Sequence, residues 1–190
     1  MEKRFREAAR YLGYQAKVID EQTYNMLVEG FAKLEAIKHS RFVYRLFLIN
    51  RLGNDTLKIG EIEFNSKNLA KNLSGCEKCA IFAVTLGVEV DMCIRQCAVM
   101  DMAKATALQA CAAVLVEELC DQVEEELKSQ GDLKARFSPG YGDLSLAYQK
   151  DVLRVLDASK KIGVTINDEY MMLPLKSVTA IVGIRKGSDD

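Results

Sequence analysis

The chain has 190 residues, with 26 basic and 27 acidic side chains, a formal net charge of −1 and 49% hydrophobic residues. This composition excludes a disordered or collagen-like chain, and the length favours a single domain over residues 1–190. The balanced charge gives no electrostatic reason to bind nucleic acid or an anionic membrane. No segment resembles a signal peptide or a transmembrane helix, so we expect a cytoplasmic protein.

The beginning of the chain predicts two helices. A short helix is predicted over about Lys3–Tyr11, ending at Gly13. Asp20 has the features of an N-cap, and apolar residues recur behind it at helical spacing. This pattern predicts a longer helix over about Glu21–Ile37. These N-terminal helices, about residues 3–38, are assigned to the same single domain.

Alternating side chains predict a hairpin after these helices. Residues 41–50 alternate between apolar and other side chains, which is typical of a strand. The run 56–64 also alternates but slips by one position around Gly60, and we interpret the slip as a bulge in the second strand. Ser66 then caps a short helix that extends to Leu73.

The middle of the chain predicts one buried strand and then the longest helical region. Cys79–Leu86 is an uninterrupted apolar run, typical of a strand that is covered on both faces. Val88–Lys128 predicts two helices with a break near Met100, where Asp101 can cap the second helix. The last part of this region, Glu117–Lys128, is rich in Glu and Asp and predicts a solvent-exposed face.

The C-terminal part predicts one helix and several short strands. Asp143 is a candidate N-cap for a helix that ends at Gly163. Strands are predicted over about residues 164–167, 171–173 and 177–184. The order of all these elements predicts the α+β class with a mixed or mainly antiparallel sheet.

Cysteine and histidine give weak signals of chemistry. Cys76 and Cys79 form a Cys-x-x-Cys pair, but this pair precedes a strand instead of opening a helix, unlike a redox motif. A four-thiolate metal site would need a second such pair, so we predict buried, unreactive cysteines and no metal. The one histidine, His39, is interpreted as a helix-end residue facing solvent or a carbonyl group, and no catalytic residues are assigned.

The most unusual stretch is Arg136–Asp143. Within it, Ser138-Pro139-Gly140-Tyr141 has the signature of a type II turn, because proline fixes φ at the second position and glycine accepts a positive φ at the third. Such a rigid turn can present backbone N–H groups to a ligand. Arg136 offers a planar fork for a carboxylate, and Tyr141 offers a ring face and a hydroxyl. Together they suit a small zwitterionic or cationic ligand, and the alternative is an ordinary turn before a helix.

The same stretch resembles a known family. Arg136-x-x-x-Gly140-Tyr141 matches the Arg-x-x-x-Gly-Tyr motif of the S-adenosylmethionine-binding activation domain of cobalamin-dependent methionine synthase. Three further stretches are similar to the short, stand-alone homologues of that domain, so that the resemblance spans most of the chain. These stretches are Arg10-Tyr11-Leu12-Gly13-Tyr14, Thr85-Leu86-Gly87 and Met172-Leu173-Pro174-Leu175-Lys176-Ser177-Val178.

The resemblance implies a C-shaped domain with a twisted, mainly antiparallel sheet, flanking helices and S-adenosylmethionine on its concave face. In the family, this domain restores a synthase whose cobalamin has been accidentally oxidised. An electron from flavodoxin or a similar donor reduces the cobalt, and S-adenosylmethionine supplies the methyl group. Corrinoid, folate and homocysteine domains are not found in these 190 residues. The expected partner is therefore a separate corrinoid-binding methionine synthase subunit, and the chain would position the methyl group over its cobalt.

The resemblance also implies roles in ligand binding. Arg136 would bind the methionyl carboxylate, the turn would supply backbone contacts, and Tyr141 would line the pocket beside the sulfonium or the ribose. The family uses acidic side chains on the ligand's amino group. Glu117 and Glu118 are candidates for this role, although a solvent-exposed helix face is the simpler interpretation. The expected ligand-binding residues are Arg136, Phe137, Ser138, Pro139, Gly140 and Tyr141.

Two departures from the synthase form bear on affinity. Gly142-Asp143-Leu144 stands where the synthase has a segment containing Pro and Cys, and Thr179-Ala180-Ile181-Val182 lacks an aromatic residue that lies against the ligand in the synthase. We therefore expect weaker binding or dependence on the partner. The leading hypothesis is a reactivation subunit, acting as part of a methyltransferase. The alternative is a non-catalytic S-adenosylmethionine-sensing or docking module.

Overall fold

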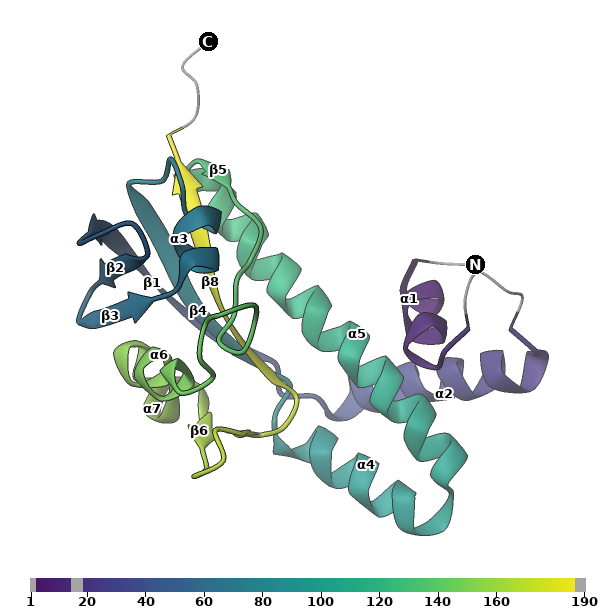
Figure 1. Cartoon of the computed structure of the whole chain (residues 1–190). Coiled ribbons are helices and arrows are strands. Elements are labelled where there is room, and N and C mark those ends of the chain that lie inside the picture. Colours follow the sequence, from purple (N-terminus) through teal and green to yellow (C-terminus); the bar gives the residue numbers. More distant parts are fainter. Residues whose placement is uncertain (1–2, 15–18, 187–190) are drawn as a thin grey trace.

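The first two helices form where the sequence places them (Figure 1). The computed structural model describes residues 3–14 and 19–186. Helix α1 spans Lys3–Tyr11 and helix α2 spans Glu21–Ile37, which confirms both predictions. Asp20 caps α2, because its carboxylate accepts a hydrogen bond from the backbone N–H of Thr23 at 2.8 Å.

A six-stranded sheet lies at the centre of the molecule. All its neighbouring strands are antiparallel, in the order β3-β2-β1-β4-β8-β5. The sheet and the helices beside it confirm the α+β class with a mainly antiparallel sheet. The strands are β1 (Arg41–Arg51), β2 (Thr56–Ile59), β3 (Ile62–Asn65), β4 (Lys78–Thr85), β5 (Asp132–Leu133) and β8 (Ser177–Arg185).

The bulge predicted in the run 56–64 is wrong. Strands β2 and β3 are separate and pair with each other, with Ile59 opposite Ile62. Gly60 begins the two-residue connection and has a φ of +60°. A type II′ turn takes glycine at this first central position. The slip in the sequence pattern therefore marks a reversal of the chain and not an inserted residue.

The helices of the middle region follow the prediction. Helix α3 spans Lys67–Asn72 and is capped by Ser66. The long helical region breaks into α4 (Val88–Met100) and α5 (Met102–Leu127), and a 3-10 turn, η1 (Lys128–Gln130), follows. Asp101 caps α5, because its side chain accepts a hydrogen bond from the N–H of Lys104 at 3.0 Å.

The helix predicted after Asp143 begins later and is interrupted. Helix α6 spans Tyr148–Leu156 and helix α7 spans Ala158–Ile162. Asp157 separates them in a left-handed conformation with φ +55°, which interrupts the right-handed helix. Asp143 does not cap α6, which corrects the prediction. The last short strands, β6 (Thr165–Ile166) and β7 (Met172–Leu173), form a separate hairpin.

Strand β4 separates two hydrophobic cores. Every residue from Cys79 to Thr85 is buried, which confirms a strand covered on both faces. Because side chains alternate along a strand, Phe82 faces the core that α1, α2, α4 and α5 share, and Ile81 faces the core that α3, α6 and α7 share. Figure 1 shows α5 beside the sheet, with α6 and α7 on its other side.

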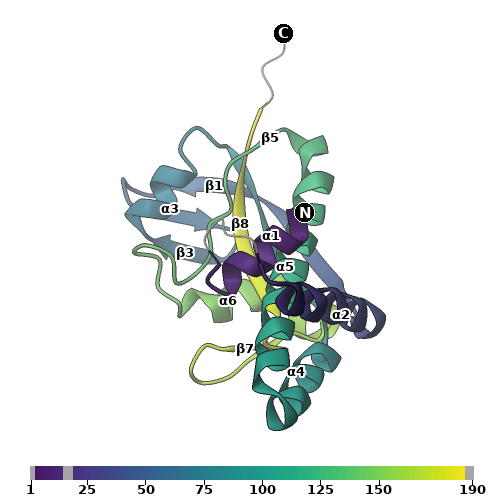
Figure 2. The same cartoon turned by 90° about the vertical axis from the view of Figure 1, so that its right-hand side faces the viewer.

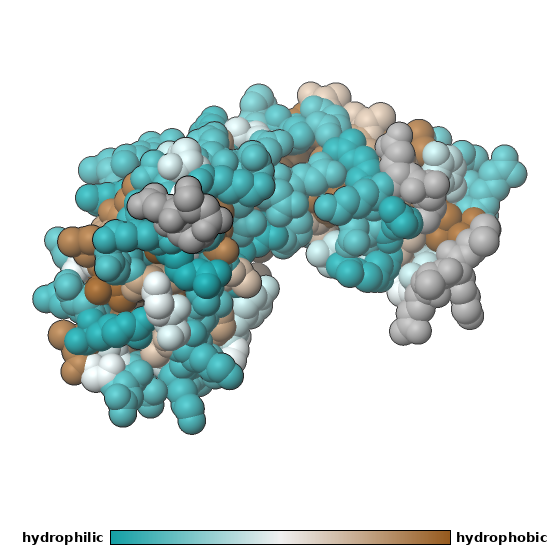
Figure 3. Space-filling view, turned by 90° about the horizontal axis from the view of Figure 1, so that it is seen from above, coloured by the Kyte–Doolittle hydropathy of each residue, from teal (hydrophilic) through white to brown (hydrophobic). Residues whose placement is uncertain are grey.

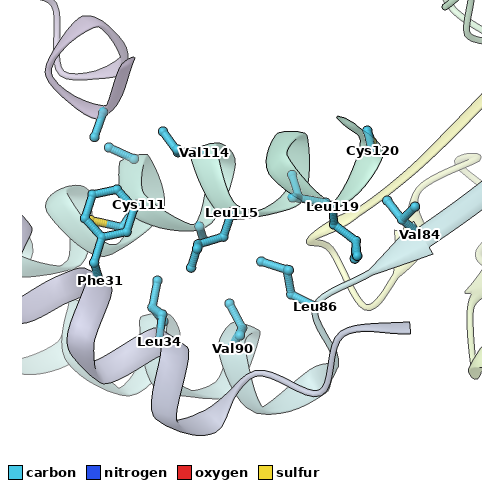
Figure 4. Packing of buried hydrophobic residues seen from close by; sticks show 14 of the residues in the cluster. Phe31, Leu34, Val84, Leu86, Val90, Cys111, Val114, Leu115, Leu119 and Cys120 are labelled. Atoms are coloured by element: carbon cyan, nitrogen blue, oxygen red, sulfur yellow. The ribbon is translucent and has the colours of Figure 1, made fainter. Parts of the chain in front are cut away.

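The larger core is formed mostly by helix packing. Figure 4 shows Phe31 and Leu34 of α2, Val90 of α4 and Leu115 of α5 meeting in one apolar cluster. Gly30 makes the approach of α2 to α5 possible, because a Cβ there would lie 3.0 Å from Sγ of Cys111. The small side chains of the two helices thus set the distance between them.

The helices and the sheet form two lobes of an arch. In Figure 3 the sheet lobe and the lobe with the N-terminal helices flank a hollow, which agrees with the expected C shape. Figure 2 shows α1 and α2 in front of α5, with the sheet behind them. Helix α5 therefore bridges the two lobes. No helix in residues 3–14 and 19–186 is long and apolar enough to cross a bilayer.

Candidate functional site

The turn at Ser138–Tyr141 has the geometry that its sequence predicts. The N–H of Tyr141 donates a hydrogen bond to the carbonyl of Ser138 at 3.1 Å, and Gly140 has a φ of +93°. A positive φ at the residue after proline is what a type II turn requires, and glycine adopts it without strain. The prediction of this turn is confirmed.

Strand β8 holds the start of the turn. Phe137 exchanges two backbone hydrogen bonds with Ile181, donating at 2.9 Å and accepting at 2.8 Å. The hydroxyl of Ser138 donates to the carbonyl of Thr179 at 2.7 Å. The turn is thus fastened to an inner strand of the sheet.

Three N–H groups in the turn and directly before it are used inside the chain. Phe137 and Tyr141 donate as described, and the N–H of Gly140 donates to the carbonyl of Leu144 at 2.8 Å. Pro139 has no N–H group. The expectation that the turn offers N–H groups to a ligand is therefore wrong for these four residues. What the turn can offer is a rigid frame for neighbouring side chains.

Arg136 lies against three carboxylates of α5. Its Nη2 is 3.1 Å from Oε2 of Glu117, and its Nη1 is 3.1 Å from Oδ1 of Asp121 and 3.6 Å from Oε2 of Glu124. The three acids follow helical spacing, so they share one face of α5. Asp121 is exposed, as predicted for this acidic stretch, whereas Glu117 and Glu124 are only partly exposed. We call this group the Arg136 cluster.

Carboxylates balance the positive charge of the Arg136 guanidinium, but the guanidinium makes few hydrogen bonds. With the described residues it makes one, from Nη2 to Glu117. Nη1 is buried and has no hydrogen-bond partner there, although Asp121 lies close to it. A short distance without alignment of the N–H bond is an ion pair and not a hydrogen bond. The fork of Arg136 therefore has hydrogen-bonding capacity that the described residues leave unfilled.

Burial affects the ionisation of this cluster. Burial lowers the pKa of Arg136, but the thiol of Cys120 and the three acids raise it more, so the net shift is upward. Burial raises the pKa of Glu124, and the charge of Arg136 offsets this only in part. Arg136 therefore stays cationic, and Glu124 takes up a proton at a higher pH than an ordinary glutamate.

Glu118, next to Glu117 in sequence, has a different partner. Arg4 of α1 donates to its carboxylate from Nε at 3.2 Å and from Nη2 at 2.7 Å, and Nη2 also lies 2.9 Å from Glu35. The guanidinium of Arg4 lies 4.7 Å from the centre of the Phe31 ring. Glu118 thus holds α1 in place. Of the two acidic candidates, Glu117 is the one beside Arg136.

A cavity of about 320 Å³ opens between α1 and α5. Tyr11 lies on its α1 side and Val114 on its α5 side. Glu117 and Asp121 belong both to this cavity and to the Arg136 cluster. A ligand in this space can therefore contact both α1 and the carboxylates that surround Arg136.

Tyr141 projects from the turn and is 61% exposed. Its ring lies edge-on to that of Phe137, with the centroids 6.3 Å apart. Burial raises the pKa of Tyr11, and the negative charge of Glu117 raises it further. Tyr141 is not one of the residues that line the cavity between α1 and α5.

Gly142 and Asp143 fasten the turn to α3. The carboxylate of Asp143 accepts hydrogen bonds from the hydroxyl of Ser66 and from the N–H groups of Lys67 at 2.9 Å and Asn68 at 3.2 Å. The bond from Ser66, and then those from the backbone, lower the pKa of Asp143. Gly142 has a φ of +55°, and a Cβ there would lie 2.3 Å from Nδ2 of Asn68. The departure from the synthase pattern thus has a structural role.

The cysteines are six free thiols. Burial raises the pKa of Cys79 to about 12, so this thiol is protonated at neutral pH and is a poor nucleophile or metal ligand. Within residues 3–14 and 19–186, no group of three or more His, Cys, Asp or Glu side chains could hold a metal ion. His39 is exposed, and its Nε2 lies 3.9 Å from Glu89.

Comparisons with known proteins define the fold. No protein-family model and no curated protein matches the sequence. Among solved structures, the crystal structure of the MetH reactivation domain bound to AdoHcy matches with a TM-score of 0.67. The match covers 97% of this chain and 76% of that chain, at 17% sequence identity. The chain therefore has the fold of the MetH reactivation domain, the fold that its resemblance to the activation domain family predicts.

Proposed function

We propose that this protein binds S-adenosylmethionine and serves as a cytoplasmic reactivation subunit for a cobalamin-dependent methionine synthase. The observation that carries the proposal is the cationic fork of Arg136, which has unused donors, lies among carboxylates and follows a helix of a MetH reactivation fold. The AdoHcy in the neighbouring structure is the demethylated form of S-adenosylmethionine and supports this class of ligand.

The charges of the site complement those of the ligand. S-Adenosylmethionine carries a carboxylate, an ammonium and a sulfonium group. Its carboxylate would bind the unused donors of Arg136, a charge-assisted and planar interaction. Its ammonium would bind Glu117, which lies 3.1 Å from Arg136 and lines the cavity. With three carboxylates around one guanidinium, the cluster favours a ligand with net positive charge.

The aromatic residues fit the rest of the ligand. Tyr141, which projects from the turn and is exposed, would lie along the sulfonium or the ribose. Tyr11 and Val114 provide a partly apolar space between α1 and α5 for the adenosine. The ligand would thus lie on the concave side, between the sheet lobe and the N-terminal helices (Figure 3).

In this function the chain contributes binding and orientation. The methyl group belongs to the ligand, and cobalamin on a separate corrinoid-binding subunit supplies the metal that accepts it. A flavodoxin-like protein is the proposed electron donor. The turn is fastened to β8 through Phe137 and Ser138 and to α3 through Asp143, so it holds a bound ligand in one orientation. Such positioning lowers the barrier by proximity.

A second candidate is a non-catalytic module that senses S-adenosylmethionine. One observation favours it. The residues Thr179-Ala180-Ile181-Val182 include no aromatic residue and all four are buried, so this part of β8 offers a ligand neither a ring nor an exposed side chain. A ligand that lacks this contact would bind more weakly and could exchange readily, as a sensor requires.

Two measurements test the proposal. Calorimetry with S-adenosylmethionine should show binding to the wild-type protein, and absence of binding at millimolar ligand would overturn the ligand assignment. A reductive methylation assay then combines this protein, a corrinoid-binding synthase subunit in its oxidised form, a reductant and S-adenosylmethionine. Methylcobalamin that forms only when this protein is present supports the reactivation subunit. Binding without any such effect supports the sensing module.

A further inference from the structure

Two buried polar side chains lie behind the turn. Gln149 of α6 is 3% exposed and Thr179 of β8 is 2% exposed. A buried amide or hydroxyl costs free energy unless it is paired. Nε2 of Gln149 donates a hydrogen bond to Oγ1 of Thr179 at 2.7 Å. The hydroxyl of Thr179 in turn donates to Oε1 of Gln149 at 3.0 Å. Nε2 also donates to Sδ of Met172 at 2.9 Å.

Both ends of the segment 138–149 are hydrogen-bonded to Thr179. Its carbonyl accepts the hydrogen bond from the hydroxyl of Ser138, and its side chain binds Gln149. Between these two attachments the segment leaves the sheet, carries Tyr141 outward and returns to the sheet. It is therefore a loop closed onto a single residue of β8, and we call it the Thr179 loop.

The Thr179 loop is rigid in itself and rests on a rigid base. Inside the loop, the N–H of Leu144 donates to the carbonyl of Tyr141 at 3.0 Å, and the N–H of Gln149 donates to the carbonyl of Leu146 at 2.9 Å. Thr179 lies opposite Ala83 in the ladder between β4 and β8. The place of the loop on the sheet therefore depends on its few attachments to β8 and α3.

We propose that Gln149 and Thr179 are positioning residues for S-adenosylmethionine. Both are buried, so they act on the ligand through the loop that follows Arg136 and carries Tyr141. This inference rests on the proposed function. An apolar pair of similar size would fill the same space at a similar free energy of folding. It would not fix the direction of the loop, because only hydrogen bonds depend strongly on angle.

The test replaces both partners at once. In the double variant Thr179→Val with Gln149→Leu, no buried polar group is left unpaired, so the protein should fold with a thermal midpoint close to that of the wild type. Its affinity for S-adenosylmethionine should fall about tenfold, because a displaced binding group loses much of its contribution. Thr179→Ser keeps the hydroxyl and should restore affinity to within about twofold of wild type.

A matched control comes from Thr85 on β4, the strand next to β8. Ser177 of β8 donates to Oγ1 of Thr85 at 2.9 Å, and Thr85 is as buried as Thr179. Thr85→Val removes a comparable hydroxyl away from the loop, and it should change stability without changing the affinity for S-adenosylmethionine.

A readout without ligand separates this inference from the proposed function. In the NMR spectrum of the ligand-free protein, the amide signals of Gly140 and Gly142 should shift or broaden in the double variant and stay in place in Thr179→Ser. Unchanged signals together with unchanged affinity would overturn the inference. If the wild type does not bind S-adenosylmethionine while the signals still move, the proposed function fails and the positioning of the loop stands.

Discussion

Two arginines meet the acidic face of α5, and they meet it in different ways. Arg4 donates two hydrogen bonds to Glu118, another to Glu35, and lies over the ring of Phe31. Arg136 lies near three carboxylates, yet makes one hydrogen bond with the described residues and leaves Nη1 without a partner. Arg4 therefore has its hydrogen-bonding capacity used by the fold, and Arg136 does not.

The difference supports the proposal that Arg4 serves structure and that Arg136 serves a ligand. A guanidinium whose donors are paired with carboxylates in a planar geometry stabilises the packing of its helix. A buried donor without an acceptor costs stability, and a ligand carboxylate can recover that free energy on binding. More neighbouring charge around Arg136 thus coincides with less hydrogen bonding, and this combination supports a binding role.

The largest expected effect concerns binding. Arg136→Ala should weaken the affinity for S-adenosylmethionine about 100-fold, since a charge-assisted pair contributes roughly 1.5–3 kcal/mol. Arg4→Ala should weaken the affinity less than Arg136→Ala, because Arg4 lines the cavity and holds α1 but is not expected to bind the ligand's carboxylate. Calorimetry on both variants measures the difference. Equal losses would break the distinction between the two arginines, and Arg136→Lys, which keeps the charge without the fork, should bind with intermediate affinity.

The stability of α1 should fall in Arg4→Ala and stay unchanged in Arg136→Ala, which is the reverse of the order expected for binding. Arg4→Ala removes the ion pairs that hold α1 on α5, and we expect a loss of about 1–2 kcal/mol and a fall of a few degrees in the thermal midpoint. Hydrogen exchange of the α1 amides should accelerate in this variant and remain slow in Arg136→Ala. Fast exchange of α1 in both variants would contradict the assignment of Arg4 as the anchor.

Adjacent glutamates give a finer test. Glu117→Gln keeps the shape of the side chain but removes the charge that should meet the ligand's ammonium, and we expect about tenfold weaker binding. Glu118→Gln, whose carboxylate faces Arg4, is the matched control and should lose less affinity than Glu117→Gln, because Glu118 lines the cavity but is not expected to meet the ligand's ammonium. The two variants compared by calorimetry should therefore differ, and identical affinities would remove Glu117 from the site.

The smallest effect concerns the attachment of the turn to α3. Hydrogen bonds from Ser66 and the backbone lower the pKa of Asp143, so the native state binds this proton less readily than the unfolded state. The contribution is complete above the unfolded pKa, about 3.9, and is lost as the pH falls through the lower native pKa. Asp143→Asn should therefore show a shallower fall in thermal midpoint between about pH 4 and about pH 2. Equal slopes would contradict this anchor.

Local elements of this fold could be predicted with their bounds. Asp20 and Asp101 cap helices, and the type II turn forms at Ser138–Tyr141, because each depends on hydrogen bonds within a few residues. The prediction for Asp143 failed because its partner lies far away in the sequence. Asp143 has the features of an N-cap and does bind a helix N-terminus, but that of α3, about seventy residues earlier in the chain. The aspartate side chain shows a preference for helix N-termini, but it does not show which helix it will bind.

The candidate site divides in the same way. The Arg-x-x-x-Gly-Tyr residues stand in the sequence and predict a carboxylate-binding arginine beside a rigid turn. The involvement of Glu117, Asp121 and Glu124 is decided only when the chain reverses after α5, pairs through Phe137 with Ile181 and brings Arg136 back against the helix. Glu117 and Glu118 are neighbours with the same chemistry, yet they project toward different partners because successive residues of a helix face different directions.

By itself, then, the sequence determined the caps at Asp20 and Asp101, the turn, the buried central strand and an arginine beside the turn that is suited to a carboxylate. These features depend on short-range geometry and on the burial of apolar side chains. The tertiary structure alone decided which acids surround Arg136, which arginine has its donors filled, and that Thr179 closes the loop behind the turn. Hydrogen bonds and ion pairs act over a few ångströms and depend on angle, so their partners are settled only when distant segments pack together.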